Sequence, residues 1–414
     1  MVSSNSHLSE LMHDPQFVKV WSIGICRGIC QWLEMLVAGI FAFELTGSPF
    51  MVALLFVARL FPLTVLGLVI GTLADRTSHR FMLIVCFIFA STTSFLIFVI
   101  LTSGYETYWV ILIASVSSGI VWSNDMPVRR RLLGDVAGKD RIVSAMGLDA
   151  ATNHATRLLG PLIGGFLYQY LGAPGAYALT AVLYLIAVFL AIGLSSGASV
   201  VSKPGNLLNI KTEIYEGFAF LTRHRDVQRF LLVTIAFNIW GFPFVTMVPV
   251  IGVEQLSLSP GWIGVLASME AAGALIGCVF IASSMLSSNQ RQFYYLGTIL
   301  YVVFAFIAGW IINAWWMAAV FICIGLSQSG FSTMQSALVY AIAPPGMRSR
   351  LFGLLVICIG SGLLGMMNMG LLGEWLGGAS AVRIVALEGV VALVLIGIGW
   401  PQLRERQPVN DSNI

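Results

Sequence analysis

Of the 414 residues, 58% are hydrophobic and only 10% are charged, whereas soluble globular domains carry about 25% charged residues. This composition excludes a soluble globular protein and identifies an integral membrane protein. The formal net charge of +3 is small, and its basic residues are scattered among apolar runs, so nucleic-acid binding is not indicated. All six cysteines lie inside apolar runs, which predicts neither a disulfide framework nor a metal site, and no cofactor is expected.

Apolar runs long enough to cross a bilayer as helices, about 20 residues each, recur along the chain between brief polar segments. They predict an all-α membrane protein with twelve transmembrane helices. The segment before the first run lacks a basic n-region and a cleavage site, so the first span should remain in the mature protein. The predicted spans are residues 18–45, 50–73, 80–102, 106–127, 142–171, 176–195, 227–253, 261–286, 293–312, 314–342, 351–376 and 381–400.

The basic residues alternate between connections, which predicts the orientation of the chain in the membrane. They gather after spans two, four, six, eight and ten and in the C-terminal segment, and Arg383 is the exception. Both termini are therefore expected in the cytoplasm. A Ser-, Gly- and Asn-rich stretch separates the sixth predicted span from the seventh. Near its end an amphipathic pattern places Ile214 and Phe218 on one face of a predicted helix. The predicted divisions are a cytoplasmic segment 1–17, a six-helix bundle 18–195, a linker with an amphipathic helix 196–226, a second six-helix bundle 227–400 and a cytoplasmic tail 401–414.

A faint internal repeat supports two pseudo-symmetric halves. A shift of 211 residues, the separation of Gly119 from Gly330, also superposes Glu270 on Arg59 and Arg291 on Arg80. Such matches favour a duplicated six-helix unit over an unrelated arrangement of twelve helices.

A charged turn between spans two and three, residues 71–80, resembles the signature loop of the major facilitator superfamily. Ser78 and His79 stand where that family usually has a glycine and a basic residue. Residues 45–49, 127–129, 160–165 and 343–350 are similar to the bacterial branch that contains the enterobactin exporter and multidrug efflux proteins. The resemblance implies a transporter in the bacterial inner membrane that works by alternating access, and we expect it to act as a monomer.

The resemblance also implies a cytoplasmic latch, in which Asp75 accepts hydrogen bonds from the start of span eleven and pairs with an arginine at the end of span four. Carboxylates are stabilised at a helix N-terminus, which gives the latch a physical basis. The alternative is a solvated loop that only fixes orientation. The predicted gating residues are Gly71, Asp75, Arg76, Arg80, Arg129 and Arg350.

The fifth span carries Gly160, Pro161, Gly164 and Gly165. Proline removes one helical hydrogen bond and glycines allow a second helix to approach, so this segment should be bent and tightly packed. The stretch resembles an antiporter motif of the superfamily, and helix packing alone is the alternative.

Ionisable residues inside spans are costly and are candidates for function. Arg27 and Asp149 lie at similar depths in parallel spans, as do Glu34 and Arg157, so these are predicted as two ion pairs, with Glu270 competing for Arg157. A carboxylate among them could couple transport to protons, or the pairs could be static. His154 is interpreted as a core residue, and Glu388 should face protein. The candidate proton-coupling or ion-pair residues are Arg27, Glu34, Arg59, Asp149, Arg157 and Glu270.

The substrate path should lie near mid-membrane between the halves, lined by spans one, four, seven and ten. Its mixture of aromatic and amide side chains suits an amphipathic organic molecule, although aromatic residues also face lipid. Residues 238–244 include a glycine and a proline, which predicts a locally broken helix. The candidate path residues are Trp32, Trp122, Asn124, Asp125, Asn238, Trp240, Phe244, Gln328, Phe331 and Gln335.

The residues distinguish three classes of function. An enzyme would need a site such as a zinc-binding His-Glu-x-x-His or a nucleophile elbow, and neither occurs. A non-transporting receptor remains an alternative, but the loops are too short for a soluble domain. A proton-coupled exporter of a siderophore, drug or metabolite is predicted, with uptake of a small organic solute as the alternative.

Overall fold

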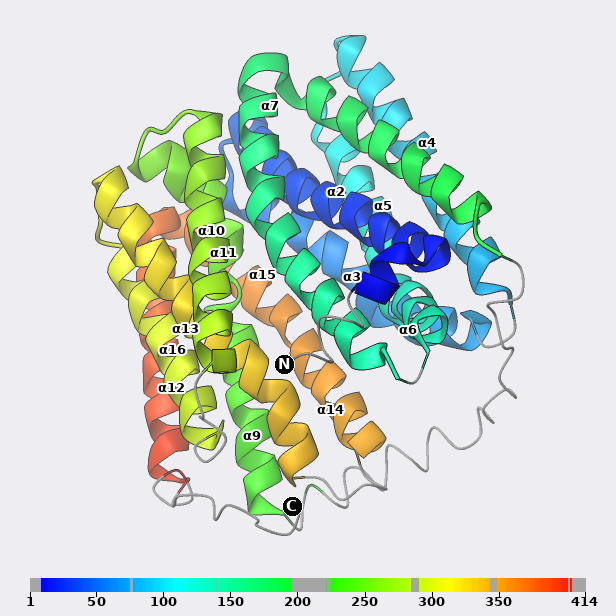
Figure 1. Cartoon of the computed structure of the whole chain (residues 1–414). Helices are drawn as coiled ribbons and strands as arrows, with labels where there is room; N and C mark the ends of the chain where they lie inside the picture. Colours follow the sequence, from blue (N-terminus) through cyan, green and yellow to red (C-terminus); the bar gives the residue numbers. More distant parts are fainter. Residues whose placement is uncertain are drawn as a thin grey trace. The chain divides into compact units, whose positions relative to one another are not determined.

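The structure is a computed structural model that describes residues 9–74, 77–138, 140–195, 221, 224–283, 290–342, 348–400 and 403. Its regular structure in these ranges is helical (Figure 1). The chain divides into two compact units, one within Met1–Gly205 and Leu258–Ser268 and the other within Asn206–Ser257 and Met269–Ile414. The predicted latch residues Asp75 and Arg76, the side chain of Arg350, and most of the predicted linker and tail lie outside the described residues.

The first unit contains a bundle of long apolar helices. Its first helix begins after Asp14, whose carboxylate caps the helix by accepting from the backbone amide of Gln16 at 2.9 Å. The helix ends before Gly47, which adopts the left-handed conformation (φ 63°). The helices of this unit are α2 (Pro15–Thr46), α3 (Pro49–Ala74), α4 (His79–Thr102), α5 (Tyr108–Ser123), the π-helix η1 (Asp125–Arg130), α6 (Arg131–Ala137) and α7 (Ile142–Ile192).

Ten helices among the described residues are long and apolar enough to cross a membrane. Two of the predicted spans share α7, which leaves the helical conformation at Gly172 (φ 65°, ψ −172°) within the gap predicted between them. The fourth predicted span corresponds to α5, whose 16 residues continue into η1. The chain is therefore a multi-pass membrane protein.

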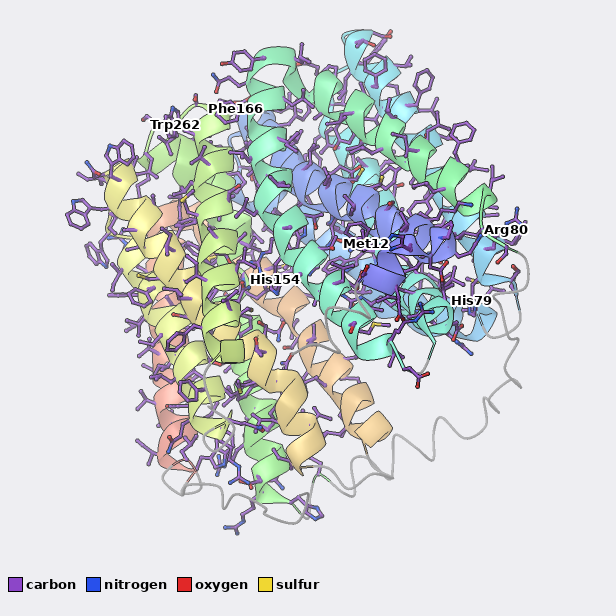
Figure 2. The ribbon with its side chains drawn as sticks, in the orientation of Figure 1. Met12, His79, Arg80, His154, Phe166 and Trp262 are labelled. Atoms are coloured by element: carbon purple, nitrogen blue, oxygen red, sulfur yellow. The ribbon has the colours of Figure 1, made fainter. Side chains whose placement is uncertain are left out.

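Glycines bring α2 and α7 into close contact. A Cβ on Gly28 of α2 would lie 2.5 Å from the hydroxyl oxygen of Thr156, and one on Gly160 of α7 would lie 2.6 Å from Cβ of Trp32. Gly165 faces Gly264, which belongs to the same unit, and Phe166 beside it, labelled in Figure 2, packs on Gly261. The tight packing predicted for the fifth span is thus present on two faces of α7.

Gly160→Ala is expected to lower the melting temperature, because the added methyl group overlaps α2 and overpacking costs about 1–3 kcal/mol. Gly147→Ala on the same helix is the matched control: nothing lies within 4 Å of its Cβ position, so it should stabilise by about 0.5–1 kcal/mol. Thermal unfolding followed by size-exclusion chromatography measures both. Equal melting temperatures for the two variants would contradict the close contact.

The second unit has interrupted helices where prolines occur. Its first membrane segment changes from α9 to a π-helix at Phe237–Gly241 and resumes after Pro243, which confirms the predicted break at 238–244. The elements are α9 (Arg225–Ala236), η3 (Phe237–Gly241), α10 (Phe244–Val250), η4 (Ile251–Gln255), α11 (Pro260–Ser283, from Met269 on), α12 (Gln290–Ala308), α13 (Ala314–Ile342), α14 (Arg348–Gly360), α15 (Gly362–Leu376) and α16 (Gly378–Ile398).

Basic side chains fasten the C-terminal end of α7. Lys19 Nζ donates to the carbonyl of Gly193 at 2.6 Å, and Arg80, labelled in Figure 2, donates to the carbonyl of Ile192 at 2.5 Å. Cations are favoured there because the last carbonyls of a helix carry negative partial charge.

In the second unit, side-chain hydrogen bonds to Asp226 join α9 to α12 and to the residue that follows α16. Asp226 at the start of α9 accepts from Arg291 on α12 at 2.6 Å and from the indole of Trp400, after α16, at 3.0 Å. Arg80 and Arg291, which the 211-residue shift superposes, therefore each lie at the start of a helix and bind a neighbouring helix, Arg80 at the end of α7 and Arg291 at the start of α9.

Candidate functional site

A cluster of buried charges lies inside the first unit, where α2, η1 and α7 meet. Pro127 cannot donate a backbone hydrogen bond, and the chain around it forms the π-helix η1 instead of a regular turn. Such wider turns are frequent at functional sites. Here the π-helix presents Asp125 and Arg129 to α2 and α7.

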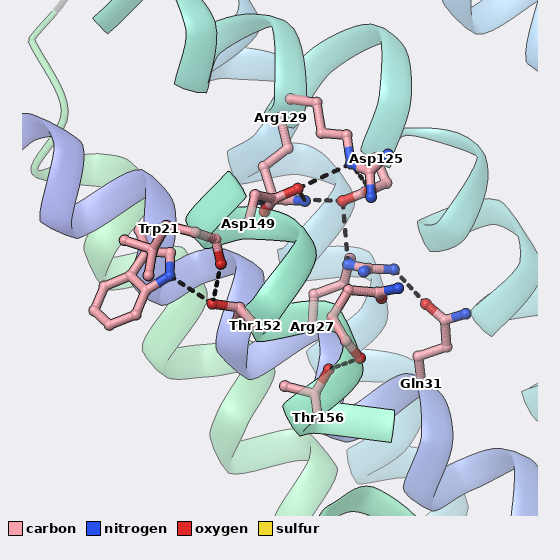
Figure 3. Close-up of polar contacts among 11 residues, drawn as sticks. Trp21, Arg27, Gln31, Asp125, Arg129, Asp149, Thr152 and Thr156 are labelled. Carbon is pink, nitrogen blue, oxygen red and sulfur yellow. Dashed lines mark hydrogen bonds and ion pairs between the residues drawn. The ribbon is translucent and has the colours of Figure 1, made fainter. Parts of the chain in front are cut away.

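Two carboxylates in this cluster bind three arginines (Figure 3). Asp125 Oδ1 lies 2.5 Å from Nε of Arg129 and 3.1 Å from Nε of Arg27. Asp149 lies 2.7 Å from Nη1 of Arg129 and 3.0 Å from Nε of Arg130. Four of the five side chains are at most 5% exposed, whereas that of Arg130 is 33% exposed. Both carboxylates are therefore tightly paired.

The predicted pair of Arg27 with Asp149 is wrong. Arg27 pairs with Asp125 and also donates to the side chain of Gln31, and Asp149 pairs with Arg129 and Arg130. Arg27 and Asp149 do both lie in this cluster. The prediction left out the charged side chains that η1 turns inward, Asp125 and Arg129. Arg129, predicted as a partner of the latch, is one of these buried charges.

Small and polar residues on the facing helices make room for the cluster. A Cβ on Gly24 would lie 2.6 Å from Nη1 of Arg129, so a larger residue there would displace this guanidinium. One turn away, the indole of Trp21 donates to the hydroxyl of Thr152 at 2.8 Å (Figure 3). His154, labelled in Figure 2, is half-buried on α7.

Glu34 forms a second, looser group on α2. Its Oε2 accepts from the hydroxyl of Ser118 at 2.7 Å and lies 3.9 Å from Nη2 of Arg59. That same Nη2 donates to Ser118 at 2.5 Å and to the carbonyl of Gln31 at 2.8 Å. All these side chains are about 95% buried. The carboxylate is thus held by a neutral serine, with its cation at the edge of ion-pair distance.

The predicted pair of Glu34 with Arg157 is also wrong. Arg59 from α3 reaches Glu34 instead, and the guanidinium of Arg157 lies over the ring of Trp32, 5.1 Å from its centroid. Helices α3 and α5 approach closely enough for this because a Cβ on Gly119 would lie 2.1 Å from the carbonyl oxygen of Arg59. Trp32, a predicted path residue, is consequently a stacking partner of a cation.

Three predicted path residues come together in the second unit. Phe331 stacks on Phe237, with ring centroids 3.8 Å apart. Gln335 donates to the hydroxyl of Thr234 at 3.4 Å, and Asn238 donates to the carbonyl of the same residue at 2.9 Å. These contacts join α13 to the interrupted helix that begins with α9.

Other predicted path residues have different surroundings. Trp240 turns to α16, where its indole donates to Glu388 at 3.1 Å. Glu388, which was expected to face protein, makes this contact at an exposed position. Phe244 is buried against Phe321, with centroids 5.4 Å apart. Asn124 donates to a carbonyl of its own helix. Gln328 is buried, Trp122 is half-buried, and Asp125 belongs to the charge cluster.

Glu270 is buried in the second unit. A Cβ on Gly325 would lie 1.9 Å from its carbonyl oxygen. Helices α11 and α13 are therefore in close contact at this charged residue, just as α3 and α5 are at Arg59.

Several participants were not predicted, among them Gln31, Ser118 and Thr234. These side chains are uncharged, so little in the sequence distinguishes them from the other polar residues within an apolar span. Only Ser118, in the pair Ser117-Ser118 before Gly119, had a usable signal, because small polar residues mark helix contacts in membranes.

Comparisons with known proteins agree with this architecture. Residues 20–362 match the model of the Major Facilitator Superfamily. The Staphyloferrin A transporter of Staphylococcus aureus (strain NCTC 8325 / PS 47) is 22% identical over 248 residues, which are 59% of this chain and 61% of that protein. The chain thus matches less than two thirds of that transporter's length. The uncharacterized MFS-type transporter YfiS of Bacillus subtilis (strain 168) is 24% identical over 89% of this chain and 88% of its own.

Solved structures share the fold at low identity. A bacterial homolog of the human lysosomal transporter Spinster superposes with a TM-score of 0.73 at 14% identity, over 95% of this chain and 96% of its own. The nucleoside transporter NupG gives a TM-score of 0.72 at 14% identity, over 93% and 99%. The chain belongs to the Major Facilitator Superfamily, whose members are membrane transporters and not enzymes.

Proposed function

We propose that the protein is a secondary active exporter that couples proton entry to the extrusion of a small amphipathic organic molecule by alternating access. It would act as a monomer with twelve spans, in six-helix bundles at residues 18–195 and 227–400. The break at Gly172 supports counting α7 as two spans, and α5 with η1 supplies another. The alternation of basic residues favours cytoplasmic termini in a bacterial inner membrane.

The observation that carries proton coupling is the geometry at Glu34. Asp125 and Asp149 are each bound closely by arginines, which suits a structural role. Glu34 is equally buried, but its Oε2 accepts from the Ser118 hydroxyl and lies 3.9 Å from Nη2 of Arg59, farther than the arginines lie from the two aspartates. Because its cation is the most distant of those at the three carboxylates, Glu34 is the carboxylate best suited to bind and release a proton during transport.

The cargo class follows from the side chains near the proposed path. Asn238, Gln335 and Phe331 offer amide hydrogen bonds beside aromatic faces, which suits an organic molecule with both polar and apolar parts. The similarity to a transporter named for staphyloferrin A favours siderophores as the first compounds to test.

Everted membrane vesicles with an imposed inside-acidic pH gradient test this function with a panel of siderophores and cationic dyes. An exporter should accumulate its substrate in these vesicles and dissipate the gradient as it does so. Accumulation only in right-side-out vesicles would instead establish uptake. A bound substrate that is never accumulated in either orientation would support a receptor.

The signature loop is proposed to act as the cytoplasmic latch, with Gly71, Asp75, Arg76 and Arg80 on one side and the start of span eleven near Arg350 on the other. We expect Asp75→Asn to increase, several-fold, the labelling of a single cysteine in the path by an impermeant thiol reagent added from the cytoplasmic side. Asp135→Asn, at an exposed position of α6, is the control. Unchanged labelling and unchanged transport in Asp75→Asn would refute the latch.

A further inference from the structure

A small cavity adjoins Glu34. It is lined by residues of α2, α4, α5 and α7, among them Glu34, Ser94, Ser117, Ser118 and Tyr177. Its volume for water-sized spheres is about 10 Å³, which is the space that one water molecule needs. The site lies wholly within the first unit.

The hydroxyl of Tyr177 is the second observation at this cavity. Tyr177 is 1% exposed, and among the described residues its hydroxyl has no hydrogen-bond partner. A buried hydroxyl without a partner costs about 1–3 kcal/mol. Buried polar groups of this kind are normally satisfied by protein or by ordered water.

We propose that the cavity binds one water molecule, held by the Tyr177 hydroxyl and the Glu34 carboxylate, and that this water delivers the coupling proton to Glu34. A polar cavity of one-water size with several hydroxyl groups meets the requirement of two to four partners for a buried water. Tyr177 is thereby a positioning residue. Ser118 and Arg59 contact Oε2 of Glu34, and the water binds the carboxylate from the cavity.

The proton transfer is a simple exchange. A proton that reaches the site makes the bound water a hydronium ion; one of its O–H bonds breaks, the O–H bond of the Glu34 carboxylic acid forms, and neutral water stays in the cavity. This role rests on the proposed proton coupling through Glu34. The water site itself does not depend on it, and the two can be tested separately.

Hydroxyl-radical footprinting of the full-length protein in lipid nanodiscs tests the water site directly, because radicals formed from a bound water label adjacent side chains. Tyr177 should be labelled several-fold more than Tyr294, a tyrosine in the second unit that is also fully buried but bonded to Thr234. Ala114→Val, which adds methyl groups at the cavity wall, should reduce the labelling of Tyr177.

Infrared titration of the Glu34 carboxyl band, assigned by its loss in Glu34→Gln, tests the link to the proton. Tyr177→Phe should move the midpoint by about one pH unit, the effect of one hydrogen bond, whereas Tyr294→Phe should leave it unchanged. Labelling of Tyr177 no higher than that of Tyr294 overturns the water site. Labelled Tyr177 with an unmoved midpoint overturns its role toward Glu34. Intact coupling in Glu34→Gln would refute the proposed function and leave the water site standing.

Discussion

Arg129→Met is expected to unfold at a much lower temperature than the wild-type protein. Arg129 is 2% exposed and binds Asp125 at 2.5 Å and Asp149 at 2.7 Å. Removing it leaves two buried carboxylates without their principal cation, a change that costs about 3–5 kcal/mol in buried ion pairs. Thermal unfolding in detergent, followed by size-exclusion chromatography, measures the loss.

A double variant distinguishes the loss of the attraction between Arg129 and the aspartates from the cost of leaving a buried carboxylate without a cation. In Arg129→Met with Asp149→Leu, one buried carboxylate is removed together with the cation, so part of the stability should return. Arg225→Met, at an exposed position of α9, should unfold like the wild type. If Arg129→Met also unfolds at the wild-type temperature, the cluster does not hold the bundle together.

Glu34→Gln is expected to abolish proton-driven transport while the protein stays folded. Glutamine keeps the shape of the side chain, and its amide oxygen can still accept from Ser118, but it cannot take up a proton. Loss of a positioned proton carrier typically costs about 10²-fold or more in rate. Transport in vesicles with an imposed pH gradient gives the measurement.

The same variant should retain substrate exchange at equal pH, because that reaction moves no net proton. Glu44→Gln, an exposed position on the same helix, is the matched control and should transport normally. Proton-driven transport by Glu34→Gln at the wild-type rate would exclude Glu34 as the coupling carboxylate.

Hydropathy predicted the helices well where local signals mark their ends. The first predicted span, residues 18–45, corresponds to α2 (Pro15–Thr46) because an apolar run of sufficient length lies between an Asp cap and a Gly stop. The gap predicted between spans five and six contains Gly172, where α7 leaves the helical conformation. Close packing at Gly160 was predictable because glycine in an apolar helix usually marks a contact.

The partners of the buried charges were not predictable in the same way. Depth in the membrane follows from the rise per residue, but the direction in which a side chain points depends on rotation about the helix axis. The π-helix at Asp125–Arg130 changes that rotation and turns Arg129 inward. Arg59 lies 3.9 Å from Glu34 but belongs to α3, whereas the comparison of depths considered only pairs between the first and fifth predicted spans.

Proton movement during transport tests the central claim most directly. Proteoliposomes containing a fluorescent pH indicator, given a gradient of an identified substrate without an imposed pH gradient, report whether substrate flow drives protons the other way. We predict a substrate-dependent pH change with wild-type protein and none with Glu34→Gln at equal protein content. Substrate flow without any pH change in the wild type, or an undiminished pH change in Glu34→Gln, would contradict proton-coupled export through Glu34.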